Sequence, residues 1–369
     1  MDGKSPTSPR TGVSYEHHDA CGVGFLAQID GTPSHGIVKD GLTMLGCVQH
    51  RGGINPDGSG DGAGIQTQIP HGLVNKAYYD QAGFEAAGSL GVGVFFLPRQ
   101  DWWARDQVQK IVTDHMQNAG YKDTIWRDVP VEKETLSTLA RQTMPHIMQL
   151  LVPPQEGMKG QDFEKHLFVV RRQIEKDIAE RGLSRGGSET FYVPSMSSQR
   201  IIYKGMALAP HLSKVFPDLK DDSFKSAYII FHNRFSTNTM PEWPLAHPFR
   251  MLAHNGEVNT VVGNRNAMPM HARRFADAYG PDYAKVTPVI IRGRSDSADA
   301  DSAMEYYRHT GLSLPTIKSM MAPEAVRSSS QLPDDVRRMY DYIYATYDQW
   351  DGPAMFIVSD GNMVLAAGD

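Results

Sequence analysis

The sequence has few cysteines and no long apolar run. Two cysteines, Cys21 and Cys47, occur among 369 residues. This excludes a disulfide framework and fits a reducing compartment, with the cytoplasm as the expected location. The longest apolar stretch lies near Val92 to Leu97, far shorter than the roughly 20 residues that a membrane-spanning helix needs. We therefore expect no membrane segment.

An excess of charge of one sign is also lacking. The chain has 37 Lys and Arg residues against 42 Asp and Glu residues, a formal net charge of -5. This balance gives no electrostatic reason to expect nucleic acid or an acidic membrane as a partner. Hydrophobic residues make up 40% of the chain, which is enough to fill the core of a globular protein of this length.

The first twenty residues, MDGKSPTSPRTGVSYEHHDA, contain Pro, Ser and charge but no apolar core, so they differ from a secretory signal. We interpret residues 1–20 as a flexible leader. Further on, strands and helices are interleaved without regular alternation, and no repeat or linker-like stretch divides the chain. Residues 21–369 are therefore expected to form one α+β domain.

Hydrophobic periodicity and turn residues predict the order of the elements. Strands are expected near 22–29, 65–69, 92–97, 146–152, 189–194, 227–232 and 250–253. Helices are expected near 36–50, 101–118, 161–182, 258–276 and 334–349. The final stretch, AMFIVSDGNMVLAAG, predicts a hairpin that turns at Asp360 and Gly361.

Cys21 begins the motif CGVGF, after Ala20 and before an apolar strand. Free cysteine is often buried, so packing is one interpretation. Cleavage between Ala20 and Cys21 would create an α-amine, with an unperturbed pKa of about 8, on the residue that carries the thiol. One residue would then supply both base and nucleophile, and no separate histidine would be required.

A metal site is another interpretation of the same segment. His17, His18 and Cys21 offer imidazole and thiolate ligands that suit zinc. Cys47 and His50, three residues apart in a predicted helix, could supply a second pair, although that placement also suits plain packing. The two leader histidines would leave with the leader. This alternative predicts tightly bound zinc.

Glycines recur between Gly52 and Gly64. The stretch lacks the Gly-Lys-Ser/Thr ending of a phosphate-binding loop and precedes a strand, so we expect no nucleotide site. Glycines there allow tight turns and close backbone approach beside a pocket. Arg51 and Asp61 are the polar features of this stretch, and Arg51 taken alone would ordinarily be a solvated cation.

Further polar residues follow predicted strands. Arg234 stands just past a buried strand, where a guanidinium can grip a carboxylate bidentately or form a structural salt bridge. Asn255 and Gly256 offer a side-chain amide and an unhindered backbone N–H, which suit an oxyanion hole or a simple turn. Asp296, in RGRSDSADAD, could equally be a helix N-cap or part of a solvent loop.

Together, CGVGF, HRGG, GDGAG, YKG, RFSTNT, AHNGEVNT and RSDSA resemble, in order and wording, the class II amidotransferase domain at the N-terminus of the glutamate synthase large subunit. RFSTNT followed by HNGEVNT separates this family from the phosphoribosylamine-, glucosamine-6-phosphate- and asparagine-forming relatives. The resemblance implies a four-layer αββα sandwich of the Ntn-hydrolase type. It makes residues 1–20 a propeptide and residues 21–369 the amidotransferase domain.

The resemblance also implies a mechanism. Cys21 would attack the side-chain amide of glutamine, and its own α-amine would pass the proton to the leaving ammonia. A γ-glutamyl thioester would then be hydrolysed to glutamate. Asn255 and Gly256 would hold the tetrahedral oxyanion.

Substrate contacts are implied by the same resemblance. Arg234 would pair with the α-carboxylate of glutamine and Asp296 with its α-ammonium, so that asparagine, one methylene shorter, fits badly. Arg51 would line the same pocket.

The sequence departs from the family pattern in two ways, both beyond the last hairpin. In the family this hairpin continues into a further strand segment with arginine and asparagine, whereas this sequence ends at Asp369. The FMN-binding synthase domain, the iron–sulfur site and the β-helix of glutamate synthases are also not in this sequence. Two cysteines are too few for a Cys-ligated cluster, so no cofactor or metal is expected in this chain.

The implied partners supply the rest of the reaction. A synthase domain or subunit, holding FMN and an iron–sulfur cluster, would use the ammonia to form glutamate from 2-oxoglutarate. Its electron donor would be either an NADPH-linked subunit or ferredoxin. The alternative is a non-catalytic glutamine-binding or structural module.

Overall fold

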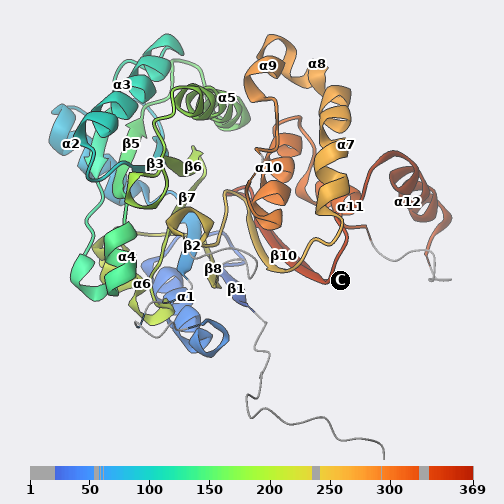
Figure 1. Cartoon of the computed structure of the whole chain (residues 1–369), viewed down its shortest axis with the longest axis horizontal. Helices are drawn as coiled ribbons and strands as arrows, with labels where there is room; N and C mark the ends of the chain where they lie inside the picture. Colours follow the sequence, from blue (N-terminus) through green and yellow to red (C-terminus); the bar gives the residue numbers. More distant parts are fainter. Residues whose placement is uncertain are drawn as a thin grey trace, which may run out of the picture.

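The computed structural model describes residues 21–53, 58, 60, 62–234, 242–291, 293–323 and 332–368. Its strands form three sheets, in the orders β1-β8-β2-β7, β11-β10-β9 and β4-β5-β3-β6, and the strand pairs described within them are antiparallel. Helices and antiparallel sheets in one chain confirm the predicted α+β class (Figure 1).

The bounds of the strands are β1 Gly22–Ala27, β2 Ala63–Gln68, β3 Gly91–Leu97, β4 Ile125–Asp128, β5 His146–Val152, β6 Tyr192–Ser197, β7 Arg200–Gly205, β8 Tyr228–Asn233, β9 Leu252–Gly256, β10 Ala354–Ser359 and β11 Val364–Gly368. Those of the α-helices are α1 His35–Cys47, α2 His71–Ala82, α3 Trp102–Asn118, α4 Thr138–Thr143, α5 Gly160–Glu180, α6 Leu212–Val215, α7 Val261–Arg274, α8 Ala276–Tyr279, α9 Tyr283–Val286, α10 Asp296–Arg308, α11 Leu314–Met321 and α12 Asp334–Thr346.

The first two sheets contact each other through a small apolar cluster. Tyr228 and Ile230 of β8 pack with Ala253 of β9 and Ile357 of β10. Because successive side chains of a strand point to opposite faces, the residues between them face away from this contact. The ends of β1, β8 and β9 are thereby brought near one another.

Helices cover the other faces of these two sheets. Ile229 and Phe231 of β8 share a core with Val38 and Leu45 of α1. Phe356 of β10 belongs to a second core that includes residues of α7, α10 and α11. Helix α1, the first sheet, the second sheet and the α7–α10–α11 group therefore follow one another through the molecule.

The third sheet lies beside the first. Phe95 and Leu150 pack with Val108 of α3 and Ile174 of α5, so that these two helices cover one face of the sheet. Strands β6 and β7 follow one another in the chain and connect this sheet to the first one. In Figure 1 the third sheet and its helices occupy one side of the molecule, and α7 to α12 occupy the other.

Buried charges join α5, α10 and the segment before β9. Glu175 accepts hydrogen bonds from Arg171 and Arg172 at 2.7 Å and from Arg250 at 2.8 Å, and Arg171 also pairs with Glu305 of α10 at 2.6 Å. Burial alone would raise the pKa of Glu175, but the surrounding guanidinium groups hold it well below its usual range. Since Arg250 leads into β9, the network fixes the approach of this strand.

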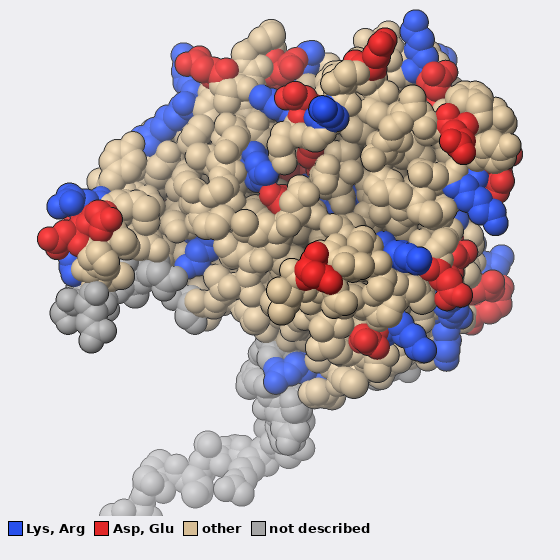
Figure 2. Space-filling view, turned by 180° about the vertical axis from the view of Figure 1, so that it is seen from behind, with Lys and Arg blue, Asp and Glu red and all other residues tan. Residues whose placement is uncertain are grey.

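The surface of the described chain mixes both charge signs. Figure 2 shows basic and acidic side chains interspersed on one face, without a continuous basic area there. Among the described residues, no helix combines the length and the apolar character needed to cross a bilayer.

Most predicted elements are present, with shifted ends. The helix predicted over 36–50 ends at Cys47, and a 3-10 turn covers Gln49–Arg51. The predictions omitted the strands β4 and β7, the short helices α4, α6, α8 and α9, and the longer helices α2, α10 and α11. Both alternatives given for Asp296 are wrong. Ser295 is the N-cap of α10, so Asp296 is the first helical residue and not the cap, and residues 297–307 are buried, so the segment is not a solvent loop.

Replacing Glu175 by Gln tests the buried network. The variant leaves three buried guanidinium groups with one carboxylate fewer, so we expect the free energy of unfolding to fall by about 3–5 kcal/mol in urea denaturation. Lys110→Ala is the control, because its pair with Asp114 is exposed and such pairs contribute about 0–1 kcal/mol. Equal effects of the two variants would contradict a stabilising role for the network.

Candidate active site

The side chain of Asn255 contacts the backbone of Cys21 on both sides of its Cα. The backbone N–H of Cys21 donates to Asn255 Oδ1 at 3.3 Å, and Asn255 Nδ2 donates to the carbonyl oxygen of Cys21 at 3.3 Å. Cys21 directly precedes β1, and Asn255 lies near the end of β9. The carboxamide thus holds the partly buried Cys21 at the place where the first two sheets meet.

Close backbone packing explains the position of Cys21. A Cβ on Gly22 would lie 2.7 Å from Cγ2 of Val48, so the start of β1 approaches the end of α1 as closely as only glycine allows. Asn233, which pairs with Gly22 in the sheet, donates from Nδ2 to the carbonyl of Val48 at 2.9 Å. The turn that contains the exposed Arg51 is therefore held beside the start of β1.

Arg234 follows β8 in an unusual backbone conformation. Its φ is 106°, and among the described residues it alone combines positive φ with a side chain. Its N–H donates to the carbonyl of Gly62 at 2.9 Å. Such a conformation costs on the order of 1–3 kcal/mol and concentrates at functional sites. Because Asn233 pairs with Gly22, Arg234 leaves the sheet at the Cys21 end. The rest of its motif, residues 235–239, and the predicted Asp61 lie outside the described residues.

Gly256 ends β9 at a position that requires glycine. Its φ is 135°, and a Cβ there would lie 1.9 Å from the carbonyl oxygen of Pro353. The next residue, Glu257, donates its N–H to that same oxygen at 3.2 Å. The motif AHNGE therefore folds as a strand end pressed against the start of β10, not as a free Asn-Gly turn.

Asp296 connects α10 to the same strand end. Its Oδ2 accepts the N–H of Val258 at 2.9 Å, and its Oδ1 accepts the N–H of Ser297 at 2.7 Å. At this first helical position the positive end of the α10 dipole stabilises a negative charge. Val258 is two residues beyond Gly256, so Asp296 lies next to the AHNGE segment.

Of the six predicted site residues, the structure brings two into direct contact. Cys21 and Asn255 contact each other directly. Gly256 follows Asn255 in the chain, Arg234 follows the strand partner of Gly22, and Asp296 accepts the N–H of Val258, two residues past Gly256. Arg51 lies further off, in the turn whose Val48 carbonyl accepts from Asn233.

Three histidines behind this site were not predicted. His232 Nε2 lies 2.9 Å from the carbonyl oxygen of His254, and the rings of His232 and His247 stack at 4.3 Å. Burial lowers the pKa of His232 to about 4 and those of the other two below their usual value. All three are therefore neutral at pH 7. His232 and His254 belong to the motifs HNRF and AHNGE, but the sequence alone does not show that their side chains are buried.

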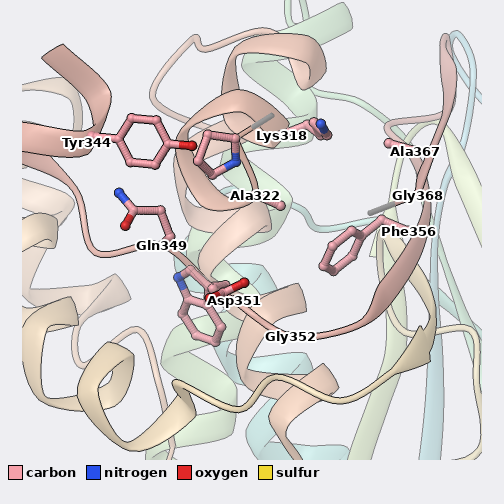
Figure 3. A pocket seen from close by; sticks show the side chains of 11 residues that line it. Lys318, Ala322, Tyr344, Gln349, Asp351, Gly352, Phe356, Ala367 and Gly368 are labelled. Atoms are coloured by element: carbon pink, nitrogen blue, oxygen red, sulfur yellow. The ribbon is translucent and has the colours of Figure 1, made fainter. Parts of the chain in front are cut away.

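A well-formed pocket elsewhere does not belong to this site. It has a volume of about 230 Å³ and lies between α11, α12 and the start of β10 (Figure 3). None of the six predicted residues lines it. Phe356 faces it from the helix-covered side of β10, whereas the neighbouring Ile357 faces the first sheet.

The zinc alternative receives no support from the described part of the chain. No group of three or more His, Cys, Asp and Glu side chains there could hold a metal ion. His50 Nδ1 lies 3.1 Å from the carbonyl oxygen of Cys47. His17 and His18 lie outside the described residues.

Comparison with known proteins identifies the class. A model of the family described as glutamine amidotransferases class-II matches residues 21–369. The chain belongs to this family, as the resemblance implied.

The similar curated proteins are glutamate synthases. The chain is 40% identical over 357 residues to the NADPH glutamate synthase large chain of Azospirillum brasilense, an alignment that covers 96% of this chain and 23% of the relative. It is 38% identical over 361 residues to ferredoxin-dependent glutamate synthase 2 of Synechocystis sp. (96% and 22%), and 35% identical over 353 residues to the Bacillus subtilis NADPH large chain (95% and 23%). It spans less than a quarter of the length of these relatives.

Gly256→Ala tests the close packing at the end of β9. The methyl group would collide with the Pro353 carbonyl at a positive φ, so we expect the free energy of unfolding to fall by at least about 2 kcal/mol. The control is Gly263→Ala in α7, where a Cβ meets nothing within 4 Å; it should raise stability by about 0.5–1 kcal/mol. Thermal denaturation of both variants measures the difference, and an unaffected Gly256→Ala protein would refute this packing.

Proposed function

We propose that this chain hydrolyses L-glutamine to L-glutamate and ammonia, with Cys21 as the nucleophile. The observation that carries the proposal is the pair of hydrogen bonds by which Asn255 holds Cys21. Membership of the class-II glutamine amidotransferases supports it.

Removal of the propeptide, residues 1–20, would start the chemistry. While Ala20 is attached, the nitrogen of Cys21 is an amide and cannot act as a base. Cleavage gives an α-amine with an ordinary pKa of about 8. One N–H of this amine would still donate to Asn255 Oδ1, which leaves the nitrogen lone pair to accept the proton of the thiol.

The reaction then proceeds in two halves. The sulfur of Cys21 attacks the amide carbon of glutamine, and the α-amine takes the thiol proton. That proton passes to the amide nitrogen and the C–N bond breaks. Ammonia departs, and a γ-glutamyl thioester on Cys21 remains. Water, deprotonated by the amine, attacks the thioester, and glutamate departs as the thiol re-forms.

Asn255 and Gly256 would stabilise the oxyanion in both halves. The NH₂ group of Asn255 has two hydrogens, and one of them is used on the carbonyl of Cys21. The other is available to the oxyanion, together with the N–H of Gly256. Arg234 would bind the α-carboxylate of glutamine, Asp296 its α-ammonium, and Arg51 would line the pocket.

The fold and the partners belong to the same proposal. The succession of α1, two sheets and the α7–α10–α11 group supports an αββα sandwich of the Ntn-hydrolase type. Ammonia would pass to a synthase domain or subunit for glutamate formation from 2-oxoglutarate, with electrons from an NADPH-linked subunit or ferredoxin. FMN and the iron–sulfur cluster would belong to that partner, and the cytoplasm is the proposed compartment.

Cys21→Ala tests the proposal in a protein that begins at residue 21. We expect ammonia release from glutamine to fall by about 10³-fold or more, because the variant lacks the attacking sulfur. Circular dichroism checks that the fold is retained. Cys47→Ala, at an exposed cysteine, is the matched control and should retain full activity.

Two results would contradict the proposal. Undiminished turnover by Cys21→Ala would exclude the nucleophile. Stabilisation of the unaltered protein by glutamine without ammonia release would identify the alternative, a non-catalytic binding module.

A further inference from the structure

A chain of side-chain hydrogen bonds connects the oxyanion strand to the carboxylate at the start of α10. His254 Nδ1 lies 2.7 Å from the hydroxyl oxygen of Ser297, and that hydroxyl lies 3.3 Å from Asp296 Oδ1. His254 directly precedes Asn255 on β9, and its ring stacks on Phe356 at 5.1 Å. Both His254 and Ser297 are buried.

The proton positions in this chain follow from its chemistry. An ionised carboxylate only accepts hydrogen bonds, so the single hydroxyl hydrogen of Ser297 points to Asp296. The Ser297 oxygen must then accept from Nδ1–H of His254. Burial lowers the pKa of His254, so the ring is neutral and its Nε2 has no hydrogen; that buried atom has no hydrogen-bond partner among the described residues. In this series of hydrogen bonds, both His254 and Ser297 therefore donate in the direction of the Asp296 carboxylate.

The carboxylate of Asp296 is nearly saturated by these contacts. Oδ2 accepts the N–H of Val258, and Oδ1 accepts both the N–H and the hydroxyl of Ser297. A carboxylate offers about four acceptor positions, so about one remains. Rotation about the side-chain bonds would break these three hydrogen bonds, so the carboxylate is held in one orientation. The remaining acceptor position therefore has a fixed direction.

We propose that Ser297, held by His254, is a positioning residue that directs the remaining acceptor position of Asp296 toward the α-ammonium group of glutamine. The proposal rests on the function proposed above. It makes recognition of the ammonium group depend on a residue outside the substrate pocket, and it links that recognition to the strand that carries Asn255 and Gly256.

Comparison of two substrates tests this role. Glutamine and its analogue without the α-amino group, 4-carbamoylbutanoate, share the reacting amide and the carboxylate. In a protein that begins at Cys21, Ser297→Ala should lower kcat/KM for glutamine by about 10-fold, the loss that one buried hydrogen bond produces. For the analogue, which has no ammonium to bind, the loss should stay under about twofold.

Two further variants separate positioning from general damage. Ser297→Thr keeps the hydroxyl and should keep the unaltered ratio of the two kcat/KM values, even if the extra methyl group lowers both. Ser302→Ala removes another buried hydroxyl of α10, which donates to the carbonyl of Ala298 at 2.8 Å, and should leave the ratio unchanged. Equal losses for both substrates in Ser297→Ala, or no loss for glutamine, would overturn the proposal.

Failure of the proposed function would be visible separately. If the unaltered protein releases no ammonia from glutamine, that function is wrong, and calorimetric binding of glutamate and glutarate then tests Ser297. The proposal stands if Ser297→Ala weakens the binding of glutamate about 10-fold and the binding of glutarate by less than about twofold. It falls if both ligands are weakened equally or if neither is affected.

Discussion

The hydrogen bonds between the Asn255 carboxamide and the backbone of Cys21 tie the start of β1 to the end of β9. They require the ends of these two strands, which belong to different sheets, to lie close together, and two glycines make that close approach feasible. Gly22 lets β1 approach Val48, and Gly256 lets β9 approach Pro353. A side chain at either glycine would move one partner of the Asn255 contact.

Charge is distributed unevenly around this contact. Behind it lie the neutral rings of His232, His247 and His254, whose burial lowers their pKa values and disfavours protonation. The buried ion pairs of Glu175 and Glu305 lie further along, where α5 and α10 meet the segment before β9. Such pairs act here as a fixed scaffold, because breaking one leaves a buried charge without compensation. The charged residues proposed to bind the zwitterionic substrate lie elsewhere, Arg234 just past β8 and Asp296 at the start of α10.

The sequence alone predicted those elements whose motifs allow a single structural interpretation. An apolar run after Cys21 predicted β1, and the Asp360-Gly361 pair predicted the β10–β11 hairpin. It was insufficient for α10, because RGRSDSADAD looks solvent-exposed; Asp299 and Asp301 are buried there against Arg265 and the backbone of Met251 and Leu252. The positive φ of Arg234 and the burial of His254 likewise depend on distant partners that periodicity does not reveal.

Covalent labelling tests the central claim most directly. In a diazoketone analogue of glutamine the diazo carbon takes up the thiol proton, and the thiolate then displaces nitrogen gas and leaves a stable thioether. In a protein that begins at Cys21, intact mass and peptide mapping should show a single adduct on Cys21, and glutamine should prevent its formation. Labelling of the exposed Cys47 instead, or an adduct on Cys21 that glutamine does not suppress, would contradict a glutamine site built around Cys21 and Asn255.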